Sequence, residues 1–258
     1  MQSIAPNSHE KSSEYHIARR RWVARPGLRK LLAGLEGSPE PHRTLYIKPD
    51  SKSPEPVAGP DVAEVLREVP KSETVLAIFL GDDSAIAISP PFPIEEDSFA
   101  EDIDISPLTE LLDRDLTVGV VLLRLGRYAV GVVHGEKLVA SKSGSRHVKN
   151  RHKQGGSSQR RFERSRERLV REIFDKACEV MRTVFVPYTN RMDYILLGGE
   201  KTTLKGLEER CAYLTKTDIE VLGRRLAVER PGKIALDAIH REVWKSHVYE
   251  LERTPRPP

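Results

Sequence analysis

The chain of 258 residues is poor in metal-binding and redox-active side chains. It has two cysteines, Cys178 and Cys211, which lie far apart and lack the spacing of a metal site. Its eight histidines are scattered, again without ligand spacing. Two distant cysteines also cannot form the disulfide framework of a small secreted domain. We therefore predict no metal site, buried structural roles for both cysteines without a disulfide, and a reducing compartment.

Long apolar segments are also absent. The N-terminus has no apolar run resembling a secretory signal, and no stretch approaches the length of a transmembrane helix. Hydrophobic residues make up 38% and charged residues 31% of the sequence, which is typical of a globular protein with a polar surface. We predict a cytoplasmic location and no membrane among the partners.

Motifs for the common types of catalysis are missing as well. The sequence contains neither a P-loop nor a dinucleotide-binding fingerprint, so we expect no cofactor. Ser157 or Ser158 could act as a nucleophile with His147 or His152 as the base. However, no Gly-x-Ser-x-Gly turn surrounds these serines, and no acidic residue is placed to orient the histidines. The pattern therefore argues against a serine hydrolase.

Positive charge is concentrated in one segment. The formal net charge is only +4, but residues 142–171 contain eleven Lys or Arg and two Glu, a local charge of +9. The rest of the chain therefore carries −5. A neutral to acidic body with one strongly basic segment predicts contact with a polyanion at a single place.

The order of expected elements divides the chain into an arm and two domains. Residues 1–25 are polar and basic and are expected to form a flexible arm. Residues 26–105 are expected to form a smaller α+β domain, with a proline-rich loop over 49–60. Residues 106–258 are expected to form an α/β domain with a mixed sheet, because a strand meander precedes alternating strands and helices.

Apolar periodicity indicates where the individual elements lie. A short helix through Leu28 and Leu35 is expected to stop at Gly37. A helical turn is expected from Ser106. Longer helices are expected over residues 159–184, 202–211 and 233–251, and strands over 74–80, 84–89, 118–125, 128–133, 137–140 and 194–197.

The segment 143–159 is a basic loop between a strand and a long helix. It has one apolar side chain in its whole length, so it cannot be buried in a core. Loops that rigid elements hold on both sides are frequent sites of function. A solvated hairpin tip without function is the alternative.

The helix after this loop has two opposite faces. The apolar face consists of Phe162, Leu169, Ile173, Ala177, Val180 and Val184. The opposite face carries Arg160, Arg164, Arg168 and Arg171. Only Glu163 and Glu167 are nearby as partners, so we expect several guanidinium groups without a protein carboxylate. Because arginine binds phosphate in a bidentate manner, this face favours contact with an RNA backbone over plain solvation.

The loop and the helix start resemble the catalytic domain of eukaryotic and archaeal class I peptide-chain release factors. In that family a Gly-Gly-Gln tip precedes a helix with an Arg-Phe-x-x-x-Arg pattern, matched here by Arg161, Phe162 and Arg166. The glycines are Gly155 and Gly156, and two inserted serines separate them from Gln159. This Gly-Gly-x-x-Gln spacing is similar to that of the Vms-like release factors, which free nascent chains from stalled large subunits. The resemblance covers residues 116–207.

The resemblance implies a catalytic role for Gly155, Gly156 and Gln159 in the hydrolysis of peptidyl-tRNA. It also implies that the tRNA's terminal ribose hydroxyl helps to move the proton. The residues expected to bind RNA are Arg146, His147, Lys149, Arg151, His152, Lys153, Arg160, Arg161, Arg164 and Arg168. The expected partners are the rRNA of the large subunit and peptidyl-tRNA, with no DNA, and we expect a monomer.

Two departures from the termination factors favour rescue of stalled or split ribosomes. No Asn-Ile-Lys-Ser decoding motif occurs in the first hundred residues, so stop-codon reading is not expected. The chain also ends after the expected catalytic domain, without the third domain of the termination factors. Two alternatives stay open: a ribosome-binding rescue factor that does not catalyse, and a nuclease that cuts the tRNA near its 3′ end.

Overall fold

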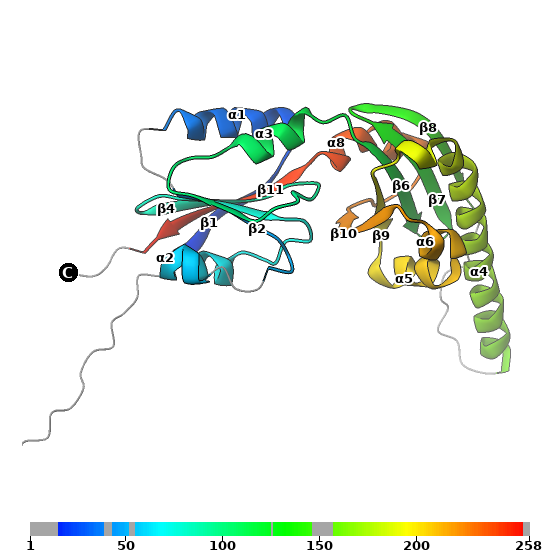
Figure 1. The fold of residues 1–258 in the computed structure, drawn as a ribbon. Coiled ribbons are helices and arrows are strands. Elements are labelled where there is room, and N and C mark those ends of the chain that lie inside the picture. The colour runs from blue at the N-terminus through cyan, green and yellow to red at the C-terminus, as the bar shows by residue number, and fades with distance from the viewer. Residues whose placement is uncertain (1–14, 39–42, 52–54, 125, 146–156, 255–258) are drawn as a thin grey trace, which may run out of the picture. The chain divides into compact units, whose positions relative to one another are not determined.

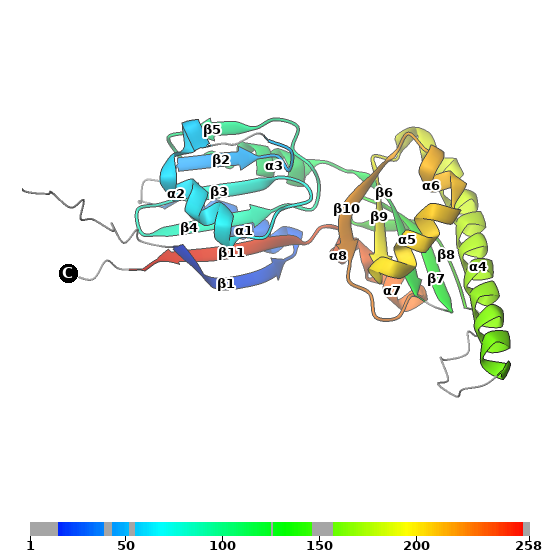
Figure 2. The same cartoon turned by 90° about the horizontal axis from the view of Figure 1, so that it is seen from below.

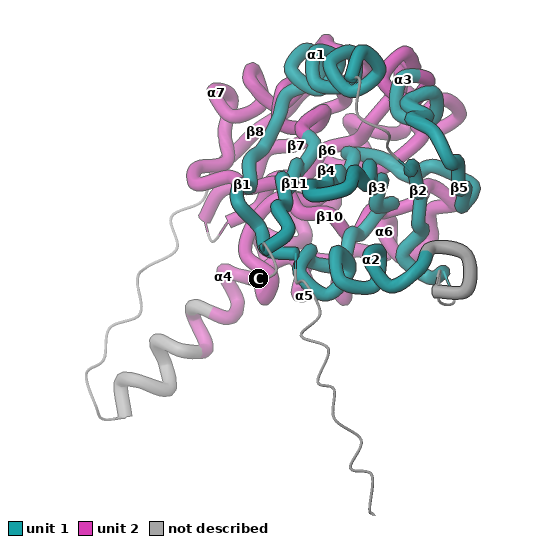
Figure 3. Tube along the Cα trace, turned by 90° about the vertical axis from the view of Figure 1, so that its left-hand side faces the viewer, with its two compact units in different colours: residues 1–109, 246–258 teal, residues 110–245 magenta. Residues whose placement is uncertain are grey.

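The chain forms two compact units in the computed structural model. Residues 15–38, 43–51, 55–124, 126–145 and 157–254 are described, except for the side chains of 55–58, 157–163 and 166. Unit 1 comprises Met1–Thr109 together with Ser246–Pro258, and unit 2 comprises Glu110–Lys245 (Figure 3). The helix α3 (Ser106–Asp113) includes the division between them. Residues 246–258 therefore group with unit 1, and not with the segment 106–245 that precedes them.

Unit 1 is built on an antiparallel sheet with the strand order β1-β11-β4-β3-β2-β5. Helices α1 and α2 cover opposite faces of this sheet (Figure 1). The core under α2 includes Val62, Val65 and Ile78. The elements are β1 (Tyr15–Val23), α1 (Arg25–Glu36), β2 (Arg43–Ile47), α2 (Glu55–Glu68), β3 (Leu76–Leu80), β4 (Ser84–Ser89), β5 (Ser98–Ala100) and β11 (Ser246–Arg253).

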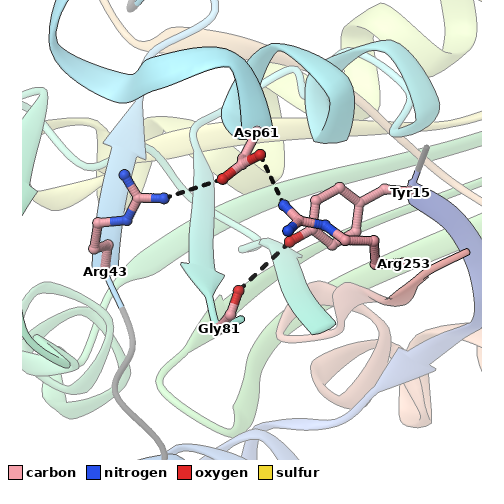
Figure 4. Close-up of polar contacts among 5 residues, drawn as sticks. All are labelled: Tyr15, Arg43, Asp61, Gly81 and Arg253. Carbon is pink, nitrogen blue, oxygen red and sulfur yellow. Dashed lines mark hydrogen bonds and ion pairs between the residues drawn. The ribbon is translucent and has the colours of Figure 1, made fainter. Parts of the chain in front are cut away.

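Polar contacts attach β11 to the rest of unit 1 (Figure 4). Asp61 of α2 forms ion pairs with Arg253 at 2.7 Å and with Arg43 of β2 at 3.4 Å. The guanidinium group of Arg253 lies 4.8 Å from the ring centre of Tyr15, whose hydroxyl donates to the carbonyl of Gly81 at 3.5 Å. One carboxylate thus joins a helix to two strands that are far apart in the sequence.

Unit 2 is built on a mixed sheet with the order β10-β9-β6-β7-β8. Strands β10, β9 and β6 are parallel, and β7 and β8 continue the sheet antiparallel. This arrangement confirms the α/β class with a mixed sheet. The elements are β6 (Thr117–Arg124), β7 (Arg127–His134), β8 (Lys137–Ser145), α4 (Ser157–Phe185), the 3-10 helix η1 (Val186–Arg191), β9 (Tyr194–Gly199), α5 (Lys201–Arg210), α6 (Ala212–Lys216), β10 (Glu220–Leu226), α7 (Lys233–Asp237) and α8 (Ile239–Val243).

Alternation along β7 explains which helices cover which face of this sheet. Val130 and Val132 pack into the core under α4, α5 and α6. Gly131 points to the other face, where a side chain would meet Leu138 and Leu236 of α7. Successive strand residues point to opposite faces, so one glycine between two valines makes room for α7 while the valines hold α4. Figure 2 shows α4 and α7 on opposite sides of the sheet.

Most expected elements are confirmed, and three expectations are wrong. Residues 15–23 form strand β1 instead of belonging to a flexible arm. The proline-rich stretch 49–60 reaches into α2, whose regular part begins at Pro60 after Gly59, which has a φ of 76°. Proline is favoured at the first position of a helix because its missing N–H is not needed there.

The third error concerns the expected final helix over residues 233–251. Helical structure there is limited to the short α7 and α8, and Ser246–Arg253 is strand β11 of unit 1. Strand β10 was also missed. Its segment contains two adjacent arginines, and one of them, Arg224, donates to the carbonyls of Val243 and Glu242. Burial lowers the pKa of Arg224 to about 10, which leaves it charged at pH 7.

Candidate functional site

Helix α4 carries Gln159 beyond the body of unit 2. The helix has 29 residues and is therefore about 43 Å long. Among its described side chains, the buried ones all lie in the C-terminal part: Ile173, Phe174, Ala177, Val180, Met181, Val184 and Phe185. Gln159 precedes Ile173 by fourteen positions, which corresponds to about 21 Å of helix. Figures 1 and 2 show this N-terminal part of α4 projecting past the sheet.

The apolar face expected for α4 is confirmed where its side chains are described. Ile173, Ala177, Val180 and Val184 are buried against the sheet, and Leu169 is half-buried. The side chain of Phe162 lies outside the described residues. Packing thus holds the C-terminal part of the helix firmly and leaves the part near Gln159 without a neighbouring sheet.

The described arginines of the polar face of α4 are exposed, but one of them has an acidic partner that was not expected. Arg164, Arg168 and Arg171 are all exposed. Arg168 donates from Nε to the carboxylate of Glu172 at 2.8 Å. This hydrogen bond raises the pKa of Arg168. The expectation that only Glu163 and Glu167 are near this face was therefore wrong, because it overlooked the glutamate one turn further along. Among the described residues, no carboxylate lies at ion-pair distance from Arg164.

A disulfide and an ion pair anchor α4 to the neighbouring helices. Cys178 of α4 is bonded to Cys211, which lies between α5 and α6, with a Cα–Cα distance of 5.5 Å. The expectation of two cysteines without a disulfide was therefore wrong. One turn earlier, Arg210 binds Asp175 through two hydrogen bonds of 2.5 and 2.8 Å, which lower the pKa of that carboxyl group. Both attachments lie in the half of α4 that packs on the sheet.

The strand that leads into the basic loop is longer than expected. β8 continues to Ser145, and Gly144 pairs with Tyr128 of β7. A side chain at Gly144 would collide with the Tyr128 ring, so glycine is required there. Beside this pair lies a hollow of about 470 Å³, lined by Glu172, Asp175 and Glu179 among others. Three carboxylates against a single lysine, Lys176, make this hollow unsuitable for a phosphate.

The structure describes only part of the residues expected to act at the site. Gln159, Arg160 and Arg161 lie in the first turns of α4, and their side chains are not described. The expected residues outside the described part are Gly155, Gly156, Arg146, His147, Lys149, Arg151, His152 and Lys153. Within the described residues, no group of His, Cys, Asp or Glu side chains could hold a metal ion. None of the helices described is both long enough and apolar enough to span a membrane.

Comparison with known proteins identifies the family. A family model of the Actinobacteria/chloroflexi VLRF1 release factor matches residues 116–249, slightly more than half of the chain. The chain belongs to this release factor family. The match covers most of unit 2, including the loop and α4, and extends into β11. The resemblance to release factors inferred from the loop and the helix start is thereby confirmed.

The curated proteins similar to this chain are also release factors. The chain is 30% identical over 118 residues to peptide chain release factor subunit 1 of Archaeoglobus fulgidus, covering 45% of this chain and 29% of that protein. For the same factor of Aeropyrum pernix, the identity is 28% over 158 residues, covering 58% and 39%. The chain therefore spans well under half of these relatives.

Two solved structures are similar at low sequence identity. One is an archaeal translation termination factor, aRF1, with a TM-score of 0.34 and 17% identity over 80% of this chain and 66% of that one. The other is described as the Vms1 mitochondrial localization core, with a TM-score of 0.40 and 14% identity over 70% and 77% of the two chains.

Proposed function

We propose that this release factor rescues stalled ribosomes by hydrolysing peptidyl-tRNA on the large subunit. The observation that carries the proposal is the position of Gln159 near the start of α4, about 21 Å of helix before Ile173, the first fully buried side chain among those described. A slim basic projection suits a reaction centre enclosed by ribosomal RNA better than a pocket would. Gly155 and Gly156 directly precede this helix in the sequence.

In the proposed reaction, water attacks the carbonyl carbon of the ester between the peptide and the tRNA. The bond from this carbon to the tRNA oxygen breaks, and a proton from water ends on the tRNA hydroxyl. The family resemblance implies that the neighbouring ribose hydroxyl carries this proton. Gln159 contributes its backbone N–H and side-chain amide, which orient water or stabilise the oxyanion. Gly155 and Gly156 allow the backbone to approach the tRNA end closely.

The arginine face and the loop cations supply the affinity for RNA in this proposal. Arg164 and Arg171 are exposed, and Arg168 can exchange Glu172 for a phosphate because that ion pair lies at the surface. Phosphate also resolves the accumulation of positive charge near the N-terminal end of the α4 dipole. The factor would act in the cytoplasm, as a monomer and without a cofactor.

The test is Gln159→Ala, assayed for release and binding on the same preparations. The substrate is a large subunit carrying labelled peptidyl-tRNA. Peptide release should fall about 100-fold or more, the typical effect of removing one oxyanion donor. Sedimentation with large subunits should be unchanged, because the arginines remain. Gln154→Ala, a neighbouring glutamine in the loop, serves as the matched control and should release peptide at the wild-type rate.

Two results would replace this proposal with an alternative. Release at the wild-type rate by Gln159→Ala would remove the catalytic role and leave a factor that only binds. The chemistry at the released tRNA end separates hydrolysis from nuclease action. Hydrolysis leaves an intact CCA end with a free hydroxyl, whereas a nuclease leaves a shortened tRNA and a peptide that still carries nucleotides.

A further inference from the structure

The edge strand β1 of unit 1 exposes a tryptophan on a prepared aromatic stack. Trp22 is 54% exposed, which is unusual for so large an apolar side chain in a strand. It lies directly opposite His247 of β11, and the two rings stack with centres 4.4 Å apart and planes inclined by 10°. The indole therefore stacks on His247 while more than half of its surface is exposed to solvent.

A third ring holds this stack in place. The ring of Tyr249 lies 4.3 Å from that of His247, and its hydroxyl shares a hydrogen bond of 2.7 Å with His247 Nδ1. Tyr249 is buried in the core of unit 1. Burial and the charge of Arg20 lower the pKa of His247, so its ring is neutral at pH 7. The three rings thus form a continuous aromatic platform that includes the exposed Trp22.

Strand β1 also carries positive charge beside the platform. β1 carries Arg19, Arg20 and Arg21 and no acidic residue. Arg21 binds Glu250 at 2.9 Å, but neither Arg19 nor Arg20 has a carboxylate at ion-pair distance within the described residues. Arg20 lies opposite Tyr249 and two positions from Trp22, so it shares their face of the sheet.

Protection of the sheet edge explains only part of this arrangement. Charged side chains on an edge strand discourage pairing with other chains, and a cross-strand aromatic pair stabilises the sheet. Edge protection accounts for the arginines. It does not account for a large apolar ring left half exposed beside them, since such a ring would favour association.

We propose that Trp22, His247 and Arg20 form a binding site for single-stranded RNA in unit 1. One base stacks on the exposed part of Trp22, and Arg20 binds an adjacent phosphate. Every base has an aromatic face, so stacking tolerates sequence variation, and arginine supplies the bidentate contact to the backbone. The site belongs to unit 1, whereas Gln159 belongs to unit 2, and it does not rest on the hydrolase proposal.

Tryptophan fluorescence reports on this site selectively. The chain has two tryptophans, and the other, Trp244, is 1% exposed and donates its indole N–H to the Gly135 carbonyl at 2.7 Å. Adding a ten-nucleotide oligouridine to the full chain should quench the emission of Trp22 saturably, as stacking requires. Gln159→Ala should show the same quenching, so failure of the hydrolase proposal and failure of this one are separate results.

Binding of labelled oligouridine to variants measures how much each residue contributes to the affinity. All carry Arg160→Ala, Arg161→Ala, Arg164→Ala, Arg168→Ala and Arg171→Ala, which removes the arginines of α4 that are expected to bind RNA and the neighbouring Arg171. Trp22→Ala should weaken affinity about 5- to 100-fold, the range expected for losing one stacked base, and Trp22→Phe should restore most of it. Arg20→Gln should lower the salt dependence by about one unit. Arg21→Gln, on the opposite face, is the matched control and should bind within about twofold.

Three outcomes would overturn the proposal. The first is no quenching by oligouridine in a chain whose Trp22 is quenched normally by acrylamide. The second is equal affinity of Trp22→Ala and the unchanged chain, with resistance of residues 15–105 to proteolysis showing that unit 1 of the variant is folded. The third is quenching of Trp22 by protein concentration alone, which would assign this edge to contact with a second copy of the chain.

Discussion

Position 199 accepts only glycine, because of its backbone conformation and its close neighbours. It ends β9 with a φ of 143°, and a side chain there would collide with the backbone carbonyl of Leu123. Gly34, in contrast, lies in α1 with no atom near the position of a Cβ. The two glycines therefore predict opposite effects of the same substitution.

Gly199→Ala should lower the free energy of unfolding of unit 2 by about 2–4 kcal/mol, because it adds a steric clash to an unfavourable backbone conformation. Denaturant unfolding followed by the emission of buried Trp244 measures this. Gly34→Ala is the control: it should leave that transition unchanged and stabilise unit 1 by about 0.5–1 kcal/mol. If both variants shifted the unfolding transition followed by Trp244 emission equally, the steric explanation for Gly199 would be wrong.

The arginines of α4 should not contribute equally to RNA affinity. Arg164 has no carboxylate at ion-pair distance among the described residues, while Arg168 is already paired with Glu172. Arg164→Ala should therefore lower the slope of affinity against salt by about one unit. Arg168→Ala should lower it less, because part of its charge is already neutralised. Binding to large subunits at several salt concentrations tests this order, and identical slopes for both variants and the unchanged chain would mean that the face is only solvated.

Among the elements, α4 could be predicted from the sequence because its apolar positions recur with the helical period between Phe162 and Val184. The meander β6–β7–β8 was predictable for a similar reason, since its strands are joined by tight turns. The disulfide was not, because the packing of α4 on α5 and α6, which brings Cys178 to Cys211, is a tertiary feature without a local pattern. The place of Gln159 near the start of α4 followed from the sequence, and its catalytic role stays a prediction.

The disulfide should contribute much of the stability of the element that carries the loop. It closes a segment of 33 residues, for which loop-closure entropy corresponds to about 3–4 kcal/mol. Reduction should lower the free energy of unfolding of unit 2 by this amount, as measured through Trp244 emission with and without a thiol reductant. Cys178→Ser should have the stability of the reduced, unsubstituted chain both with and without the reductant. If reductant changes nothing in the unsubstituted chain, the two thiols are not bonded in solution.

At the scale of the whole molecule, strand β11 completes the sheet of unit 1, so we expect unit 1 to depend on it for folding. It pairs with β1 on one side and with β4 on the other, and Arg253 binds Asp61 of α2. Its role could not be read from its own residues, since a short segment after two short helices gives no sign of pairing with strands at the other end of the chain. A periodic pattern describes an element and its buried face, but not its distant partner.

Removal of residues 246–258 should therefore unfold unit 1 and spare unit 2. The expected signs are a red shift of Trp22 emission and rapid proteolysis within residues 15–105, with the emission of buried Trp244 retained. Removal of residues 255–258 alone is the control and should leave both units intact. Loss of Trp244 burial in the longer truncation would show instead that the two units fold as one.

Because β11 lies in the middle of the sheet of unit 1 but near the end of the sequence, unit 2 can be completed before unit 1 during synthesis. Unit 2 has all its strands once residue 226 and the short helices after it have left the ribosome. Unit 1 begins about a hundred residues earlier, yet its sheet stays split until residue 253 emerges. At roughly 5–20 residues per second, β1 and β4 wait on the order of ten seconds for the strand between them. During that time β4 lacks its β11 neighbour, so a pause in synthesis leaves this edge of the sheet unpaired.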